Sequence, residues 1–119
     1  MDAQKEIRKL AADDLSEALQ LVWEGFLEFE APEYAPEGIA EFRDYIQLSS
    51  ISKMAASKKM TLWGCYVQGK LVGVIATAPL NHVSLLFVSK QFHRQGIARA
   101  LYQTVVAEAA AAAEEDFGW

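Results

Sequence analysis

The sequence predicts a single α+β domain over residues 1–119, with a mixed, mostly antiparallel sheet flanked by helices. Two segments in the first half show apolar residues at helical spacing. Aromatic and β-branched runs between Thr61 and Val88 indicate three strands, and an alanine-rich segment after Gly96 indicates a closing helix. With 119 residues and 52% hydrophobic content, the chain is long enough to bury one core.

The first predicted elements are a strand and a helix. Charged and apolar residues alternate in KEIRKL up to Leu10, as in a strand. Asp14 is placed to cap the following helix, with Glu17 three residues later in the capping-box relation. The helix carries Leu15, Leu19, Val22, Trp23 and Phe26 at helical spacing. We expect this face and Phe29 to pack in the core, or one of the aromatic rings to line a pocket.

A second helix is predicted after the irregular, proline-containing segment EAPEYAPEG. Its apolar positions are Ile39, Phe42 and Ile46, and Leu48 extends the same pattern. The helix is expected to fray through the small and polar residues of SSISKMAASKK.

The second half predicts a hairpin, a third strand and a helix. TLWGCYV and LVGVIATA are separated by a short turn around Gly69, which is typical of an antiparallel hairpin. HVSLLFV ends in four consecutive apolar residues and therefore predicts a central strand buried on both faces. The last helix carries one apolar stripe of Ile97, Leu101 and Val105.

Composition argues against several classes of protein. The net charge is −5, from 11 basic and 16 acidic residues, which disfavours a nucleic-acid surface and suits a cationic partner. The single cysteine, Cys65, cannot form a disulfide within the chain or a thiolate zinc site alone, and we expect it in the core. No apolar run is long enough to span a membrane and the N-terminus is charged, so we expect a cytoplasmic protein without a metal.

The stretch FHRQGIARAL places one glycine between a basic turn and the last helix. The first backbone N–H groups of a helix lack intrahelical acceptors and lie at the positive end of its dipole, so they can bind anions. The residues concerned are Gln95, Gly96, Ile97 and Ala98. Arg94 and Arg99 add guanidinium donors suited to a diphosphate or a 3′-phosphate. The alternative is an ordinary strand-to-helix turn with two solvated arginines.

The longer segment SLLFVSKQFHRQGIARAL resembles motif A of the GCN5-related N-acetyltransferase (GNAT) family. In that motif an apolar strand leads into an R/Q-x-x-G-x-G/A turn that wraps the pyrophosphate of acetyl-CoA. The predicted order of elements also resembles the N-terminal half of the family's fold. The resemblance implies that Leu86, Phe87 and Val88 contact the pantetheine arm through their main chain. It further implies that the pyrophosphate lies among His93, Arg94, Gln95, Gly96, Ile97 and Ala98.

Two features depart from the family pattern. His93 stands where the family usually has Arg or Gln, which removes a fixed charge or amide and leaves the backbone donors in place. An exposed turn histidine is the simpler interpretation. The family's later strand, helix and hairpin do not follow the last helix. We therefore expect a truncated domain that forms a homodimer and completes the coenzyme slot across it. Phe117 and Trp119 would pack on the sheet or against the second molecule.

Candidate residues for the acceptor and for proton transfer lie in two places. Glu28, Glu30, Glu33 and Tyr34 are close in sequence between the first two helices, a region that shapes the acceptor site in the family. We predict that Glu28, Glu33 and Tyr34 bind a cationic amine and that Glu30, if buried, acts as a base. A solvated acidic loop is the alternative.

His82 is the second candidate base, because histidine titrates near neutral pH. Strand alternation places it on the same face as Ser84. The alternative is a hydrogen-bonded histidine at the sheet edge.

These observations favour an N-acetyltransferase that transfers an acetyl group directly from acetyl-CoA to a small-molecule or protein amine. The alternative is a non-catalytic CoA-binding or dimerisation module, which would use the same phosphate turn. The sequence leaves the choice between enzyme and module open.

Overall fold

The computed structural model describes residues 4–79 and 82–116, and Phe117 and Trp119 lie outside these ranges. The strands are β1 (Lys5–Lys9), β2 (Thr61–Val67), β3 (Lys70–Ala78) and β4 (His82–Val88). The helices are α1 (Leu15–Phe29), α2 (Pro36–Tyr45), α3 (Leu48–Ala56) and α4 (Ile97–Asp116). Short 3₁₀ turns occupy Ala12–Asp14, Ala31–Glu33 and Lys90–Phe92. The predicted α+β class is confirmed.

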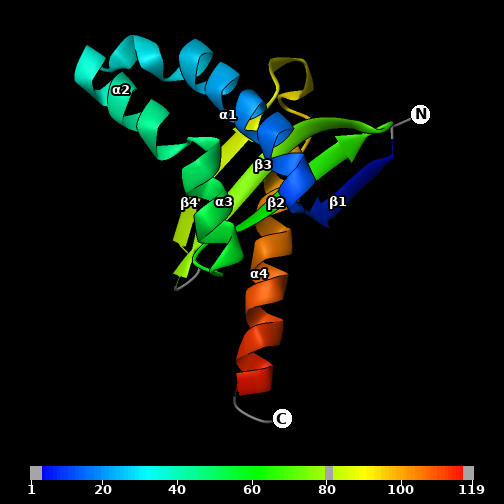
Figure 1. Cartoon of the computed structure of the whole chain (residues 1–119). Coiled ribbons are helices and arrows are strands. Elements are labelled where there is room, and N and C mark those ends of the chain that lie inside the picture. Colours follow the sequence, from blue (N-terminus) through cyan, green and yellow to red (C-terminus); the bar gives the residue numbers. More distant parts are fainter. Residues whose placement is uncertain (1–3, 80–81, 117–119) are drawn as a thin grey trace.

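The four strands form one antiparallel sheet in the order β1-β2-β3-β4 (Figure 1). The β2–β3 hairpin turns at Gln68 and Gly69, which both have left-handed backbone angles (φ 53° and 79°). Two consecutive positive φ values match the twist of the flanking strands, so the turn closes the hairpin without splaying it. The hairpin expected from the sequence is therefore present.

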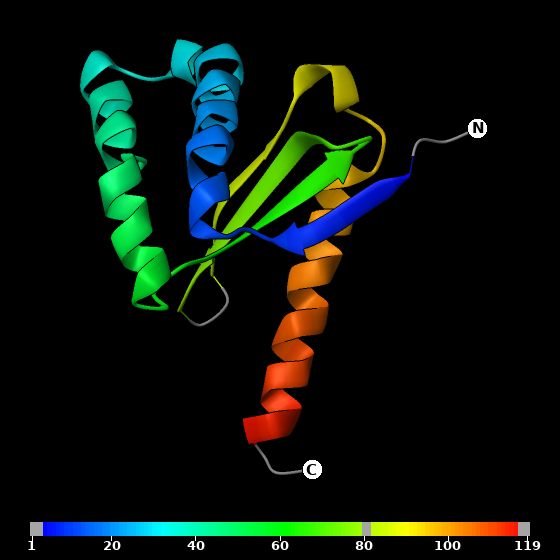
Figure 2. The ribbon, with the colours of Figure 1, turned by 45° about the vertical axis from the view of Figure 1, so that its right-hand side comes forward.

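Helices cover both faces of the sheet (Figure 2). One core lies beneath α1 and α3 and includes the fully buried side chains of Val22, Ile51 and Val74. The other lies beneath α4, where the predicted stripe of Ile97, Leu101 and Val105 is 2%, 0% and 6% exposed. Phe26 is fully buried, Trp23 is half-buried, and Phe29 is 46% exposed, so Phe29 is not a core residue. Among the described residues, no helix has the length and hydropathy needed to cross a bilayer.

The second helix of the sequence prediction is two helices. Instead of fraying, the chain breaks after Tyr45 and starts α3 at Leu48. Ile46 and Ile51 are both buried, at 6% and 0% exposure. Five positions apart on one straight helix, they would point about 140° away from each other. The break lets both side chains reach the same core.

The first helix begins where Asp14 predicts, but by a different mechanism. The Asp14 carboxylate accepts a hydrogen bond from the Ala11 backbone N–H at 2.9 Å and makes no capping bond to α1. Its backbone is already helical (φ −88°, ψ −13°), whereas a capping residue needs an extended conformation to turn its side chain onto the helix end. The carboxylate therefore closes the 3₁₀ turn that precedes α1.

The prediction of a central β4 strand is wrong. Within the described residues β4 is an edge strand, paired only with β3. Leu85 is buried at 3% exposure, but its neighbour Leu86 is 37% exposed. The apolar run arises because the two faces of β4 meet α1 and α4, while no strand of the described residues covers its outer side.

Ile51→Ala tests whether α3 is an integral part of the core. Ile51 is fully buried, so the substitution is expected to lower the free energy of unfolding by about 3 kcal/mol. Leu48→Ala on the same helix is the control, because Leu48 is 46% exposed and its loss is expected to cost below about 1 kcal/mol. Urea unfolding followed by circular dichroism measures both. Equal losses would contradict the packed position of α3.

Candidate functional site

The turn between β4 and α4 has the backbone geometry of an anion site. Arg94 and Gly96 are both left-handed, with φ values of 64° and 79°. The Gly96 carbonyl accepts the first helical hydrogen bond, from the Ala100 N–H at 2.9 Å. The N–H groups of Ile97 to Arg99 therefore have no acceptor within the helix and lie at the positive end of the α4 dipole.

The position of this turn follows from close packing of α4 on β3. A Cβ atom added at Gly73 would lie 2.9 Å from Ile97 Cγ2 and 3.1 Å from Leu101 Cδ1. Because Gly73 has no side chain, α4 can approach the sheet backbone at this point. The helix N-terminus is thereby held next to the end of β4.

The outer edge of β4 presents backbone groups beside the turn. Val88 lies opposite Gly73, and the Ser89 N–H bonds the Val72 carbonyl at 2.8 Å. In an antiparallel ladder this makes Val88 and Gly73 a non-hydrogen-bonded pair. The N–H and C=O of Val88, and by the same alternation those of Leu86, point away from β3. They are therefore directed toward any molecule lying along this edge.

A hollow of about 540 Å³ joins these two sets of groups. It is lined by Leu86, Val88, Phe92, His93, Arg94, Gly96, Ile97, Ala98 and Arg99. Of the residues expected to bind the cofactor, Phe87 and Gln95 do not line it. Phe87 faces the α1 side, with its ring 6.1 Å from that of Phe42, and the Gln95 amide donates to the Gln91 carbonyl at 3.2 Å. Phe92 was not singled out, because one apolar residue in a basic turn carries no distinctive signal.

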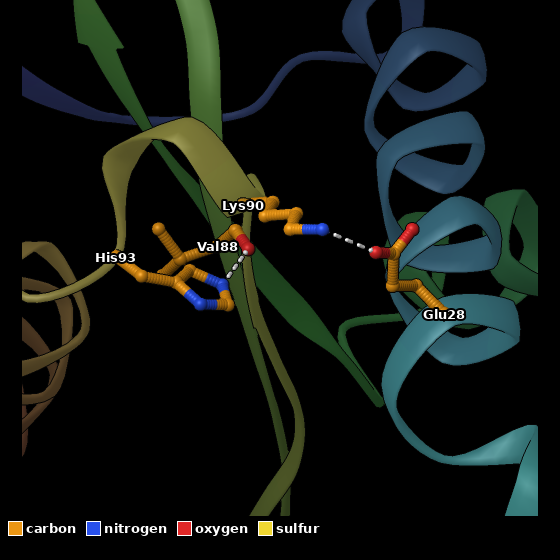
Figure 3. Close-up of polar contacts among 4 residues, drawn as sticks. All are labelled: Glu28, Val88, Lys90 and His93. Atoms are coloured by element: carbon orange, nitrogen blue, oxygen red, sulfur yellow. Dashed lines mark hydrogen bonds and ion pairs between the residues drawn. The ribbon is translucent and has the colours of Figure 1, made fainter.

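His93 folds back over the edge of β4 (Figure 3). Its Nε2 lies 2.7 Å from the Val88 carbonyl oxygen, which can only accept, so Nε2 carries the proton. The other side of the ring meets Phe29 at the end of α1, with the ring centroids 4.9 Å apart. His93 thus connects the turn, the strand edge and α1.

The predicted acceptor residues lie near the same end of the sheet, but they make different contacts. Lys90 donates to Glu28 at 3.0 Å and ties α1 to the turn (Figure 3). Glu28 also lines a groove of about 490 Å³ on the α1 side, with Glu17, Glu24, Ser89 and Val88 among its walls. Glu30 precedes the short 3₁₀ turn and Glu33 is its last residue, and neither lines this groove. Tyr34 packs edge-on against Phe26.

The candidate base His82 lies at the far end of β4 from the turn. It is exposed and stands opposite Ala78. The register shifts between Ala76 and Thr77 and leaves Ser84 as a β-bulge, whose hydroxyl donates to the Ala76 carbonyl at 3.4 Å. A bulge breaks strand alternation, so His82 and Ser84 do not share a face in the expected way.

Cys65 is a core residue, as expected. It is fully buried beneath α4. Burial raises the pKa of its thiol, and the nearby Lys5 cation offsets part of this rise. A thiol with a raised pKa stays protonated at neutral pH and is a poor nucleophile.

Lys5 is a residue near the turn that the sequence did not indicate. Its Nζ donates to the Gln95 carbonyl at 2.9 Å, although 90 positions separate the two residues. Only the pairing of β1 with β2, and the packing of α4 beneath them, brings these segments together. No local pattern in KEIRKL distinguishes Lys5 from the other charged residues of the strand.

Solved structures with a similar fold are acetyltransferases. The PaiA N-acetyltransferase of Thermoplasma acidophilum, solved with coenzyme A, has a TM-score of 0.71 and 18% identity over 95% of this chain and 74% of its own. A GCN5-related N-acetyltransferase of Rhodopseudomonas palustris has a TM-score of 0.79 and 14% identity, covering 95% and 71%. A predicted acetyltransferase of Clostridium acetobutylicum, solved with acetyl-CoA, has a TM-score of 0.71 and 12% identity, covering 98% and 90%.

At the level of sequence, no curated protein matches this chain significantly. A family model for the acetyltransferase (GNAT) domain does match, over residues 30–117. This range covers more than half of the chain and includes β4, the turn, α4 and every residue that lines the hollow between them. The chain therefore belongs to the GNAT acetyltransferase family.

Proposed function

We propose that this protein is an N-acetyltransferase that transfers the acetyl group of acetyl-CoA directly to a primary amine. The observation that carries the proposal is the hollow in which the N-terminal N–H groups of α4 meet the outward-facing backbone of β4. Such a site offers donors for a diphosphate at one end and peptide groups for an extended amide-containing arm at the other.

The residues of the hollow fit acetyl-CoA. Gly96 leaves the helix N-terminus open, since the nearest atom to a Cβ there is Lys5 Nζ at 3.7 Å. Arg94 and Arg99 line the same hollow and add charge that complements a phosphate. The outward backbone groups of Leu86 and Val88 can bond the amide-containing pantetheine arm, while the thioester farther along β4 supplies the activated acetyl group.

Direct transfer is supported by the state of Cys65. An acyl-enzyme route through cysteine needs an accessible thiolate, whereas Cys65 is fully buried and its thiol has a raised pKa. The amine itself is then the nucleophile. It must lose a proton during attack, so a base or a water in contact with one is required.

His82 is the proposed base, with Glu30 as the alternative. Glu30 follows Phe29, whose ring contacts His93 at the phosphate turn. In CoA the pantetheine arm separates the diphosphate from the sulfur, so a base beside the turn lies at the wrong end of the ligand. His82, at the start of β4, lies farther along the strand in the direction in which the arm would extend.

A cationic amine is the proposed acceptor, from a small molecule or a protein. The groove beside Glu28 carries two further glutamates of α1, Glu17 and Glu24, and reaches Val88, which also lines the CoA hollow. Lys70 and Lys90 line the same groove and Lys90 pairs with Glu28, so the charge that would favour a cationic amine at the α1 face comes from Glu17 and Glu24. We also propose that Glu33 and Tyr34, which follow the end of α1, contact the amine. A cytoplasmic location is also part of the proposal.

Gly96→Glu tests the coenzyme site. The added carboxylate would place a negative charge beside the turn and repel a phosphate, so CoA binding measured by isothermal titration should weaken at least about 30-fold. Gly69→Glu is a matched control, because Gly69 has the same φ of 79° and lies in the β2–β3 turn. Both variants should lose similar stability, about 1 kcal/mol, and only the first should lose CoA. Absence of CoA binding by the folded wild-type protein would overturn the proposed function.

His82→Gln tests the base. It should lower kcat about 100-fold and leave the Kd for acetyl-CoA unchanged, whereas Glu30→Gln should leave kcat near the wild-type value. Release of free CoA thiol measures the turnover. The reverse pattern would assign the base to Glu30.

The same assay separates the enzyme from a non-catalytic CoA-binding module and tests the acceptor. Saturable CoA binding without turnover for any amine would favour the module. Equal kcat/KM for a cationic and a neutral amine at low salt would contradict the role assigned to Glu28 and its groove.

Self-association is also proposed, on the basis of an exposed apolar surface next to β4. Leu86, Tyr102 and Val106 are 37%, 52% and 49% exposed, and the last two are one turn apart on α4. Leu86 lines the CoA hollow together with Ala98, one turn before Tyr102. A second copy covering this surface would form an outer wall for the hollow. Paired apolar surfaces of this kind suit a two-fold dimer.

Val106→Glu tests the dimer. A buried carboxylate would disrupt the interface, so the molar mass by light scattering at micromolar concentration should fall from dimer to monomer. Ala107→Glu is the control, because it adds the same charge about 100° farther round the helix. A monomeric wild-type protein would refute self-association.

A further inference from the structure

Lys5, the first residue of β1, contacts the turn between β4 and α4 through its side chain. Lys5 stands opposite Val67, whose side chain belongs to the core beneath α4. Directly opposed residues on neighbouring strands point to the same face, so Lys5 also points to the α4 side. There its Nζ donates to the Gln95 carbonyl at 2.9 Å. Lys5 does not line the CoA hollow, and it lines a separate one with Gln68 and Gly69 of the β2–β3 turn.

This contact fixes the direction of one donor. Gln95 and Gly96 share a trans peptide, because the described chain has no cis peptide bonds. Across a trans peptide the C=O and the next N–H point in opposite directions. With the Gln95 carbonyl held toward Lys5, the Gly96 N–H points away from Lys5. Gly96 lines the CoA hollow and Lys5 does not, so an N–H that points away from Lys5 is the orientation that suits a ligand in the hollow.

The turn needs such a restraint because glycine does not supply one. Gly96 adopts positive and negative φ with similar ease, so the peptide before it can rotate at low cost. Rotation would replace the N–H in the hollow with the Gln95 carbonyl oxygen, which repels a phosphate. The Lys5 ammonium opposes that rotation by binding the carbonyl on the far side.

We propose that Lys5 is a positioning residue for the coenzyme: its ammonium holds the Gln95 carbonyl and thereby aims the Gly96 N–H at the diphosphate. The inference rests on the proposed function, since it concerns the same anion site. It adds a residue from outside the turn, on a different strand. The expected consequence is a change in coenzyme affinity and not in the chemical step.

The test replaces Lys5 by Met, which keeps a long unbranched side chain and removes the positive charge and the hydrogen-bond donor. CoA binding by isothermal titration should weaken about fivefold to tenfold, while kcat at saturating acetyl-CoA stays unchanged. Lys5→Arg keeps a long cationic donor and should restore binding to within about twofold. Lys9→Met is the matched control, because Lys9 lies on the same face of β1, with its Nζ 5.2 Å from the centre of the Trp63 ring.

A second readout follows the amide directly. In the ligand-free protein, the Gly96 N–H resonance should shift and broaden in Lys5→Met and stay at its wild-type position in Lys9→Met. If the wild-type protein binds CoA and Lys5→Met binds it equally, with an unchanged Gly96 signal, Lys5 has no positioning role and the proposed function stands. Equal loss of binding in Lys5→Met and Lys9→Met would mean that the weaker binding comes from the lower net charge alone. That result would also overturn the inference. If the wild-type protein does not bind CoA, the proposed function fails and this inference fails with it.

Discussion

The contact between α4 and Gly73 of β3 is the constraint on which the site depends. Ile97 and Leu101 occupy the space in which a side chain at position 73 would lie, and both are almost completely buried. Burial of this stripe fixes both the height of α4 above the sheet and its position along the strands. The start of α4 then has to lie beside the end of β4, because only eight residues connect Val88 to Ile97. The backbone geometry of the proposed anion site is a consequence of this packing.

The donors of the site are peptide groups, which makes the site insensitive to many side chains. The first N–H groups of α4 and the outward groups of β4 are set by helix geometry and ladder alternation. His93, which stands where the family usually has Arg or Gln, leaves these groups in place and instead bonds the Val88 carbonyl and contacts Phe29. The side chains of the turn therefore act mainly by holding the backbone, as Lys90 does through Glu28.

Charge is divided between the two sides of the β4 edge. Arg94 and Arg99 line the hollow on the α4 side, and three glutamates of α1 line the groove on the other side. The chain as a whole carries a net charge of −5, so the cationic turn is a local exception. In the proposed reaction an anionic cosubstrate and a cationic acceptor would each meet a surface of opposite charge. Val88 lies between them and lines both spaces.

The sequence alone determined most of the elements and the glycine turn before α4, because these depend on local patterns. Apolar spacing marked α1 and α4, the Gly69 turn marked the hairpin, and the single glycine of FHRQGIARAL marked the helix N-terminus. Tertiary structure decided the rest. The break between α2 and α3, the edge position of β4 and the bulge at Ser84 all depend on what packs or fails to pack against those segments. The contact from Lys5 to Gln95 joins residues 90 positions apart, and only the pairing of β1 with β2 and the burial of α4 bring that distant pair within hydrogen-bonding distance.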